Sequence, residues 1–205
     1  NCGGVPQRDN VKRLSAAQQE AYNNILFQIL KKNVVLLRGV TSSGKTEIYI
    51  HLIKQALERH EQVLYLLPEI ALTVQIRQRL QKVFGDRLGI YHSKYSDAER
   101  VEIWKKQLSD SPYDVILGAR SAVLLPFSKL GLVIIDEEHE TSFKQQDPAP
   151  RYHARSVAIM LAHQHGAKTL LGSATPSAES WHNAETGKYG LVELDERYKG
   201  IEMPE

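Results

Sequence analysis

The chain has 205 residues, of which 42% are hydrophobic and 24% are charged, with a formal net charge of +2. These values are typical of a globular protein of one or two domains and exclude a disordered or fibrous chain. No apolar run approaches the ~20 residues of a membrane-spanning helix, so we expect no membrane partner, and the near-neutral charge leaves other partners open.

The first ten residues carry little information about function. The chain starts with Asn1 and not with Met, so we expect residues 1–10 to be a linker or an artificial start and residues 11–205 to form the folded domain. The single cysteine, Cys2, cannot form an internal disulfide or a cysteine-based zinc site. This usage fits a reducing environment, so we expect a cytoplasmic protein without zinc.

The first predicted helix begins after Ser15, a favourable N-cap residue. Apolar side chains then recur at i, i+3, i+4, i+7 and i+8, a spacing that places them on one helix face. These residues are Tyr22, Ile25, Leu26, Ile29 and Leu30.

Apolar strands and amphipathic helices alternate along the rest of the chain. The predicted strands are Val34–Leu37, Val63–Leu67, Gly89–His92, Asp114–Leu117, Leu132–Ile135, Lys168–Leu171 and Leu191–Leu194. The predicted helices are Thr46–His60, Leu72–Phe84, Ser96–Leu108, Arg155–His165 and Ser177–Ala184. Several strands are apolar on both faces, as in a parallel sheet that helices cover on both sides. The pattern therefore predicts a doubly wound α/β domain.

Within the predicted helix Ser96–Leu108, Trp104 has Val101 at i−3 and Leu108 at i+4, a spacing that predicts core packing for the indole ring. The segment 140–152 is polar and contains two prolines, so it is predicted to be a loop, and loops of this length inside compact domains are usually functional.

The segment from Gly39 to Thr46 follows the first predicted strand and matches the phosphate-binding pattern G-x-x-x-x-G-K-[ST] at every fixed position. In such a turn, backbone N–H groups and the positive N-terminus of the next helix bind phosphates. We expect Lys45 to reach the β- and γ-phosphates and the Thr46 hydroxyl to bind Mg²⁺. The predicted nucleotide-binding residues of the loop are Gly39, Val40, Thr41, Ser42, Ser43, Gly44, Lys45 and Thr46.

A second chemical motif, Asp136 to His139, follows the buried strand Leu132–Ile135. Ligands of an open α/β sheet bind beyond the carboxyl ends of its strands, so Asp136 is predicted beside the Mg²⁺ that Thr46 binds. Glu137, one residue further on, is suited to polarising the water that attacks the γ-phosphate. A simpler interpretation is that the acidic residues only keep the end of the strand solvated. The phosphate-binding loop upstream makes this interpretation weaker than the magnesium site.

The motif Asp136 to His139 resembles the D-E-x-H box of superfamily 2 helicases, and other segments agree with this family in order and spacing. Gly172 to Pro176 resembles the S-A-T motif, which implies that Ser173, Ala174 and Thr175 couple the nucleotide state to the nucleic acid. The resemblance runs from about Leu14 to the chain end and implies a RecA-like motor lobe with a mainly parallel sheet. It also places Lys45, Asp136, Glu137 and His139 in the catalytic set.

Three more segments extend the resemblance. Leu67 to Thr73 resembles motif Ia and Gly118 to Ala122 resembles motif Ib, both of which contact the backbone of a nucleic-acid strand in the family. Leu14 to Gln18 resembles the upstream motif whose glutamine reads adenine, which favours ATP over GTP. The implied site residues are Gln18 for the nucleotide and Pro68, Glu69, Arg120 and Ser121 for DNA.

The acidic box is followed by residues 142–146 and 151–155, which are similar to those of bacterial replication-restart helicases, the PriA family. In related helicases an aromatic-rich loop at this place senses single-stranded DNA and switches on hydrolysis. Rings stack on bases and cations hold phosphates. The resemblance implies coupling roles for Phe143 and Lys144 and DNA contacts for Arg151, Tyr152 and Arg155. It remains open whether Phe143 and Tyr152 instead pack the loop onto the domain.

The resemblance implies a 3′→5′ DNA helicase that uses ATP and Mg²⁺ in replication-fork restart and primosome assembly. Its implied partners are single-stranded and forked DNA, a second lobe of the same chain, single-strand-binding protein and primosome loading proteins. No second set of helicase motifs is visible in these residues, so they alone are expected to hydrolyse ATP hardly at all, because an arginine finger supplies about 10³–10⁵ in rate.

Three other functions remain possible at this stage. A superfamily 2 translocase that moves along double-stranded DNA would use the same lobe. A P-loop small-molecule kinase would explain Lys45 and Thr46, but it would leave the D-E-E-H and S-A-T motifs without a role. A nucleotide-binding interaction module would bind the same ligand without turnover.

Overall fold

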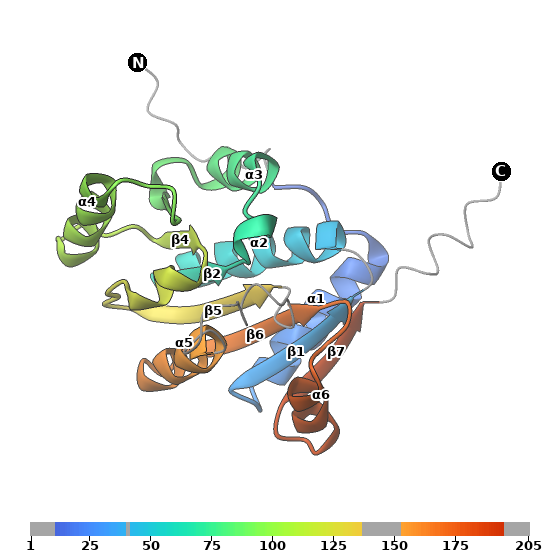
Figure 1. Ribbon diagram of the computed structural model, residues 1–205. Coiled ribbons are helices and arrows are strands. Elements are labelled where there is room, and N and C mark those ends of the chain that lie inside the picture. Colours follow the sequence, from blue (N-terminus) through green and yellow to red (C-terminus); the bar gives the residue numbers. More distant parts are fainter. Residues whose placement is uncertain (1–10, 40–41, 137–152, 195–205) are drawn as a thin grey trace.

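A computed structural model describes residues 11–39, 42–136 and 153–194 (Figure 1). Within these residues, seven parallel strands form one sheet in the order β3-β4-β2-β5-β6-β1-β7. The strands are β1 Val34–Gly39, β2 Gln62–Leu66, β3 Leu88–Tyr91, β4 Val115–Gly118, β5 Leu130–Asp136, β6 Lys168–Ser173 and β7 Gly190–Leu194. The predicted α/β fold with a parallel sheet is confirmed. We call the side at which these strands end the carboxyl edge.

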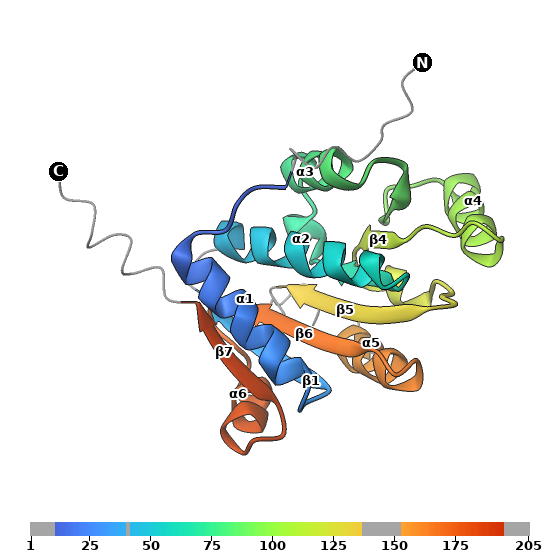
Figure 2. The same ribbon diagram turned by 180° about the vertical axis from the view of Figure 1, so that it is seen from behind.

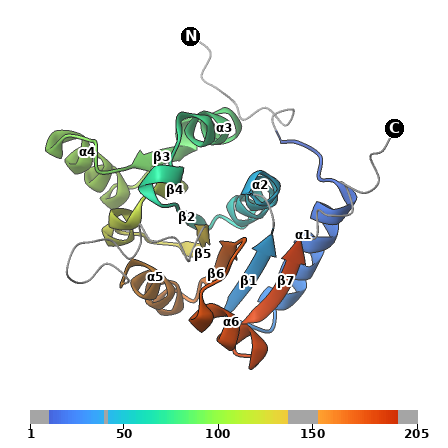
Figure 3. The same ribbon diagram turned by 45° about the vertical axis from the view of Figure 1, so that its right-hand side comes forward.

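Helices cover both faces of the sheet. The helices are α1 Ala16–Ile29, α2 Ser42–Glu58, α3 Val74–Phe84, α4 Asp97–Leu108, α5 His153–Gln164 and α6 Ala178–Glu185, with short 3₁₀ turns η2 Glu69–Ala71, η3 Gly85–Arg87 and η4 Arg120–Leu124. Helices α1, α2 and α3 lie over one face, while α5 and α6 lie over the other (Figures 2 and 3). Serines cap α1, α4 and α6: Ser15, as the sequence predicts, and also Ser96 and Ser177, which the sequence pattern placed as the first residues of their helices.

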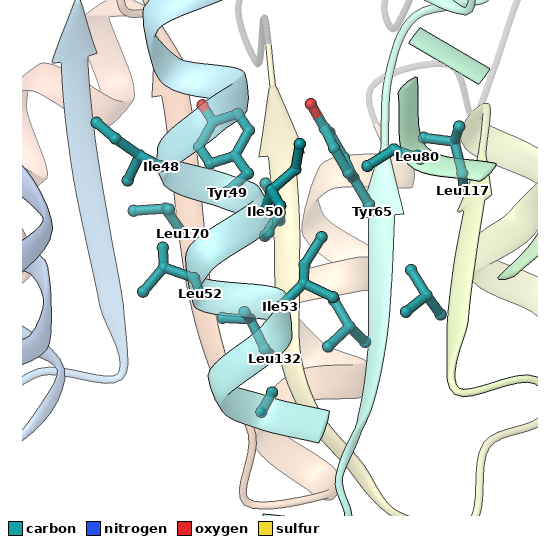
Figure 4. Packing of buried hydrophobic residues seen from close by; sticks show 14 of the residues in the cluster. Ile48, Tyr49, Ile50, Leu52, Ile53, Tyr65, Leu80, Leu117, Leu132 and Leu170 are labelled. Carbon is teal, nitrogen blue, oxygen red and sulfur yellow. The ribbon is translucent and has the colours of Figure 1, made fainter. Parts of the chain in front are cut away.

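The two faces of the sheet are covered by separate apolar clusters. Along β1, Val35 and Leu37 pack into the cluster under α1 to α3, whereas Val34 and Leu36 pack into the cluster on the other face. Side chains of a strand alternate between faces, so the part of β1 that is covered on both sides, Val34 to Leu37, is apolar at every position. Figure 4 shows the first cluster, in which residues of α2 interlock with the strands beneath.

Helix α2 begins four residues earlier than expected, at Ser42 and not at Thr46. The sequence pattern placed Gly44 in the glycine-rich turn that precedes the helix. The structure places Gly44 in the first turn of α2, at the helix end whose positive dipole favours phosphate groups. The latter half of the phosphate-binding pattern is therefore helical.

The prediction that Trp104 packs in the core is wrong. Trp104 is 37% exposed, and its predicted neighbours Val101 and Leu108 are 48% and 71% exposed. The buried residues of α4 are Ile103 and Gln107. The Gln107 amide donates to the Pro126 carbonyl at 3.1 Å and accepts from the Tyr113 N–H at 2.9 Å. A polar side chain faces inward here because it satisfies two backbone groups of neighbouring loops.

Among the described residues, no helix combines the length and the apolar character that crossing a membrane requires.

Candidate nucleotide-binding site

The carboxyl edge brings three predicted motifs together. Strand β6 lies between β1 and β5, so the end of β6 is flanked by Gly39, the first residue of the phosphate-binding pattern, and by Asp136, the first residue of the acidic motif. Asp136 is paired with Gly172, and Arg38 with Ser173. Residues more than a hundred positions apart in the sequence thus meet at one point on the sheet.

Lys45 and Asp136 form a buried ion pair. The Lys45 side chain is 0% exposed, and its Nζ lies 3.2 Å from Oδ1 of Asp136. Taking two charges out of water is costly unless each has a close partner. The aliphatic part of Lys45 runs along Gly39, where a Cβ would lie 3.2 Å from the Lys45 Cγ and Cδ atoms. The absence of a side chain at Gly39 therefore leaves space for the Lys45 side chain.

Asp136 has a second donor that the sequence did not single out. The Tyr49 hydroxyl donates to the same oxygen, Oδ1 of Asp136, at 2.7 Å. Tyr49 lies four residues after Lys45 on α2, a spacing that places both side chains on one helix face. This i,i+4 relation, with an aromatic hydroxyl on the buried face of the helix, is the signal that could have revealed it.

Thr46 and Asp136 line a cavity of about 560 Å³, a volume in the usual range of ligand sites. Both supply oxygen atoms, the ligands that Mg²⁺ prefers, so the residues fit a magnesium ion. The cavity extends to the Glu47–Arg79 pair and the η2 turn. Among the described residues, no group of three or more His, Cys, Asp or Glu side chains is placed to hold a metal ion.

Glu47 and Arg79 connect the phosphate-binding helix to α3. The Arg79 guanidinium donates through Nε to Oε1 of Glu47 at 3.1 Å and through Nη2 to Oε2 at 2.9 Å. Such two-point pairs fix orientation as well as distance. Glu47 follows Thr46 directly, and α3 begins just after the motif Ia-like segment, so the pair joins the two predicted functional regions.

Gln18 lies against the phosphate-binding loop. Its amide oxygen accepts from the Ser15 N–H at 2.8 Å, and its amide nitrogen donates to the Gly44 carbonyl at 3.1 Å. An amide nitrogen carries two hydrogens, and one contact uses only one of them. The predicted contact between Gln18 and adenine stays a prediction.

The S-A-T-like segment lies at the end of β6. Ser173 is buried, and its Oγ accepts from the Thr175 N–H at 3.0 Å. Ala174 is half-buried and Thr175 is exposed. Ser173 is thus held beside the acidic motif, while Thr175 faces outward.

The motif Ia-like and Ib-like residues share the other half of the carboxyl edge. Pro68 precedes η2, Arg120 and Ser121 begin η4, and these turns follow the adjacent strands β2 and β4. The structure gives Glu69 a protein partner, since its carboxylate accepts from the Ser93 N–H at 3.2 Å. Glu69 thereby ties η2 to the loop after β3.

Arg155 links α5 to the start of α6. Its guanidinium donates to Ser177 Oγ at 3.1 Å and to Glu179 Oε2 at 3.0 Å, so it holds α5 against the start of α6. Arg155 also lines a cavity of about 590 Å³ between these helices, which contains none of the predicted nucleotide residues. The predicted contact between Arg155 and DNA stays a prediction.

Several predicted residues lie outside the described part of the chain: Val40, Thr41, Glu137, His139, Phe143, Lys144, Arg151 and Tyr152. Ser42 and Ser43 are described only as part of the α2 backbone. The predictions for these ten residues stay predictions.

The loop after β3 contains His92, whose neutral form is favoured by its surroundings. Burial lowers the pKa of the His92 imidazole below its usual value; Glu69 and Glu99 oppose this shift, and Arg77 and Lys94 add to it. Its Nδ1 accepts from the Lys94 N–H at 3.1 Å, which requires an unprotonated Nδ1. Because the folded state favours the neutral ring, its stabilising effect is present above the ordinary pKa of about 6.5 and is lost as pH falls below it.

We therefore expect hydrogen exchange of residues 88–100, corrected for its intrinsic pH dependence, to be faster at pH 5.5 than at pH 7.5 in the full-length protein. His92→Asn keeps an acceptor near the Nδ1 position without a titrating group, so its protection should be the same at both pH values. His163→Asn, at an exposed histidine, is the control and should behave like the wild type. Equal acid sensitivity of His92→Asn and the wild type would contradict this role.

Comparison with known proteins shows which family this chain resembles. Residues 15–183 match the family described as DEAD/DEAH box helicase. The replication restart protein PriA of Bacillus subtilis is 45% identical over 172 residues, which cover 84% of this chain and 21% of that protein. PriA of Haemophilus influenzae is 44% identical over 193 residues, covering 94% and 26%. The chain spans about a quarter of the length of these relatives.

Solved structures share the fold. RecG bound to a three-way DNA junction aligns with a TM-score of 0.65 at 24% identity, covering 90% of this chain and 24% of that chain. The UvsW helicase from bacteriophage T4 aligns with a TM-score of 0.60 at 19% identity, covering 89% and 60%. A parallel sheet with a phosphate-binding loop after β1, an acidic motif after β5 and a family match over most of its length together show that this chain belongs to the DEAD/DEAH box helicase family.

Proposed function

We propose that residues 11–205 are the ATP-binding motor lobe of a DNA helicase. The observation that carries this proposal is the arrangement of the carboxyl edge. The buried Lys45–Asp136 pair lies at the ends of β1 and β5, and the Arg120–Ser121 turn lies at the end of β4 in the same sheet. A nucleotide and a nucleic-acid strand bound at this edge would contact the ends of strands in one sheet, so a change at the nucleotide could reach the nucleic-acid contacts through that sheet.

The residues of this lobe have distinct roles in the proposed reaction. Lys45 exchanges its contact with Asp136 for the β- and γ-phosphates, because the incoming phosphates carry more negative charge than one carboxylate. Asp136 and the Thr46 hydroxyl would hold a magnesium ion, which would neutralise phosphate charge. Glu137 orients the attacking water as general base, and Ser173 with His139 links this chemistry to the neighbouring motif.

The biological role is proposed from the relatives, whose names describe replication restart. We propose that the full-length protein unwinds forked DNA in the 3′→5′ direction in the cytoplasm and helps to assemble a primosome. Single-strand-binding protein, loading proteins and a second motor lobe are the proposed partners. The segment from Ser142 to Arg155 is proposed to sense single-stranded DNA.

Two assays on the full-length protein test the proposal. ATP hydrolysis should be weak alone and strongly stimulated by single-stranded DNA, and a forked duplex should be separated into strands. Displacement of a protein block from duplex DNA without strand separation would instead establish a double-stranded DNA translocase. Transfer of the γ-phosphate to a nucleotide or sugar would establish a kinase, and nucleotide binding without any turnover would establish an interaction module.

Arg120 provides a test of the DNA-binding edge. In the full-length protein, Arg120→Ala should weaken binding to single-stranded DNA several-fold at low salt, because one phosphate contact is lost. The slope of log affinity against log salt should fall by about 0.7, the value for one phosphate of a single strand. Lys129→Ala removes a cation just before β5, at the edge of the sheet where the strands begin. This control should change neither the DNA affinity nor its salt dependence. An unchanged slope in Arg120→Ala would exclude a phosphate contact there.

A further inference from the structure

Tyr49 occupies a central place among the motifs without belonging to any of them. It is fully buried on α2, and its hydroxyl donates to Oδ1 of Asp136 at 2.7 Å, the oxygen that also lies 3.2 Å from Lys45 Nζ. The Tyr49 ring packs edge-on against Tyr65 of β2, with centroids 5.4 Å apart. In Figure 4 both hydroxyl oxygens point toward the carboxyl edge.

The end of β6 is shaped around this hydroxyl. A Cβ added to Gly172 would lie 1.8 Å from the Tyr49 hydroxyl oxygen and 2.7 Å from Oδ1 of Asp136. Gly172 does not have a positive φ, so its backbone conformation does not require glycine. Glycine is required because there is no space for a side chain. The tyrosine hydroxyl therefore fills the position that a side chain at residue 172 would take, directly before Ser173.

Asp136 keeps this donor when its other partner changes. Lys45 must turn toward the phosphates when a nucleotide binds, which weakens its hold on Asp136. The Tyr49 donor comes from the rigid body of α2 and does not depend on the nucleotide. The two donors share Oδ1, and the carboxylate lines the same cavity as Thr46.

We propose that Tyr49 is a positioning residue for the metal site: its hydroxyl fixes the Asp136 carboxylate toward the cavity that Thr46 lines, and Gly172 provides the space for it. This inference rests on the proposed function in that it assumes Mg²⁺–nucleotide binding at this edge. The loss of the Tyr49 hydroxyl should therefore affect Mg²⁺ binding selectively, because the hydroxyl contacts Asp136 and would influence the phosphates indirectly, through that carboxylate.

The first test measures binding of a fluorescent ATP analogue to full-length Tyr49→Phe. In EDTA, its affinity should equal that of the wild type. In a Mg²⁺ titration of the nucleotide complex, the midpoint should rise about tenfold or more, since hydrogen bonds to charged groups are the stronger ones. Tyr22→Phe, at a half-buried tyrosine on α1, is the control and should leave the midpoint unchanged.

The results separate the two proposals. If the wild type shows no Mg²⁺-dependent nucleotide binding, the proposed function fails. If the wild type shows it and Tyr49→Phe has the same Mg²⁺ midpoint, the role of Tyr49 is overturned. An equal loss of affinity with and without Mg²⁺ would also overturn it, because general damage to the loop would then be the cause.

The second test needs no nucleotide. Gly172→Ala should lower the melting temperature and the hydrogen-exchange protection of β6 in the ligand-free protein, because its Cβ collides with the Tyr49 hydroxyl. In the Tyr49→Phe background, Gly172→Ala should lower the melting temperature and the exchange protection of β6 clearly less than in the wild type. A residual effect should remain because the new Cβ still lies close to the Asp136 oxygen. Equal losses in the two backgrounds would show that the hydroxyl does not fill this position.

Discussion

Replacing Lys45 with methionine in the full-length protein is expected to lower kcat/KM for ATP by about 10³-fold or more and to eliminate unwinding. Methionine preserves most of the buried chain length but removes the charge that would meet the β- and γ-phosphates. Loss of one well-placed group that stabilises developing charge typically lowers the rate 10²–10³-fold, and Lys45 is in addition needed for binding. The measurement is steady-state ATP hydrolysis with saturating single-stranded DNA, together with strand displacement.

DNA affinity supplies the internal control for Lys45→Met. Lys45 is 0% exposed and cannot itself contact a strand, so binding to single-stranded DNA without nucleotide should be nearly unchanged. Lys54→Met, which replaces an exposed lysine on the same helix, should leave hydrolysis intact. Retention of more than about a tenth of the wild-type turnover in Lys45→Met would remove Lys45 from the catalytic set.

The second large effect concerns stability. Asp136→Asn is expected to lower the free energy of unfolding of the ligand-free lobe by about 3–5 kcal/mol, the usual result when a buried ion pair loses one charge. The asparagine retains an acceptor for Tyr49 but no longer neutralises Lys45. Chemical denaturation of the full-length protein measures the loss, and hydrogen exchange of β5 and β6 peptides locates it.

The double variant Lys45→Met with Asp136→Asn separates charge from packing. Because both charges are then absent, it should recover most of the stability that Asp136→Asn loses, although it remains inactive. A double variant as unstable as the sum of the two single variants would show that packing, and not the ion pair, sets the stability of this site.

The strands and helices are largely readable from the sequence because their signals are local. The strand Leu132–Ile135 is apolar on both faces, and it is found at the centre of β5. The phosphate-binding pattern is contiguous, so its position between β1 and α2 follows from eight neighbouring residues. The order of the strands has no such local signal, because it depends on which faces of the helices fit together.

Trp104 shows where periodicity misleads. Its spacing with Val101 and Leu108 correctly defines an apolar stripe on α4, but a stripe is buried only if another element covers it. The sheet uses the neighbouring stripe, with Ile103 and Gln107, because loops beside it offer backbone groups that Gln107 can satisfy. Neither the loops nor their unsatisfied groups can be located from helix periodicity alone.

The sequence by itself determined the α/β class, the phosphate-binding loop and the resemblance to helicases, since each depends on residues that are close together in the chain. Only the tertiary structure decided that Lys45 and Tyr49 meet on one oxygen of Asp136, that Gly172 makes room for the tyrosine, and that Arg155 turns to α6. Such contacts join distant segments, and a parallel sheet brings its strand ends together only after every crossover helix has packed.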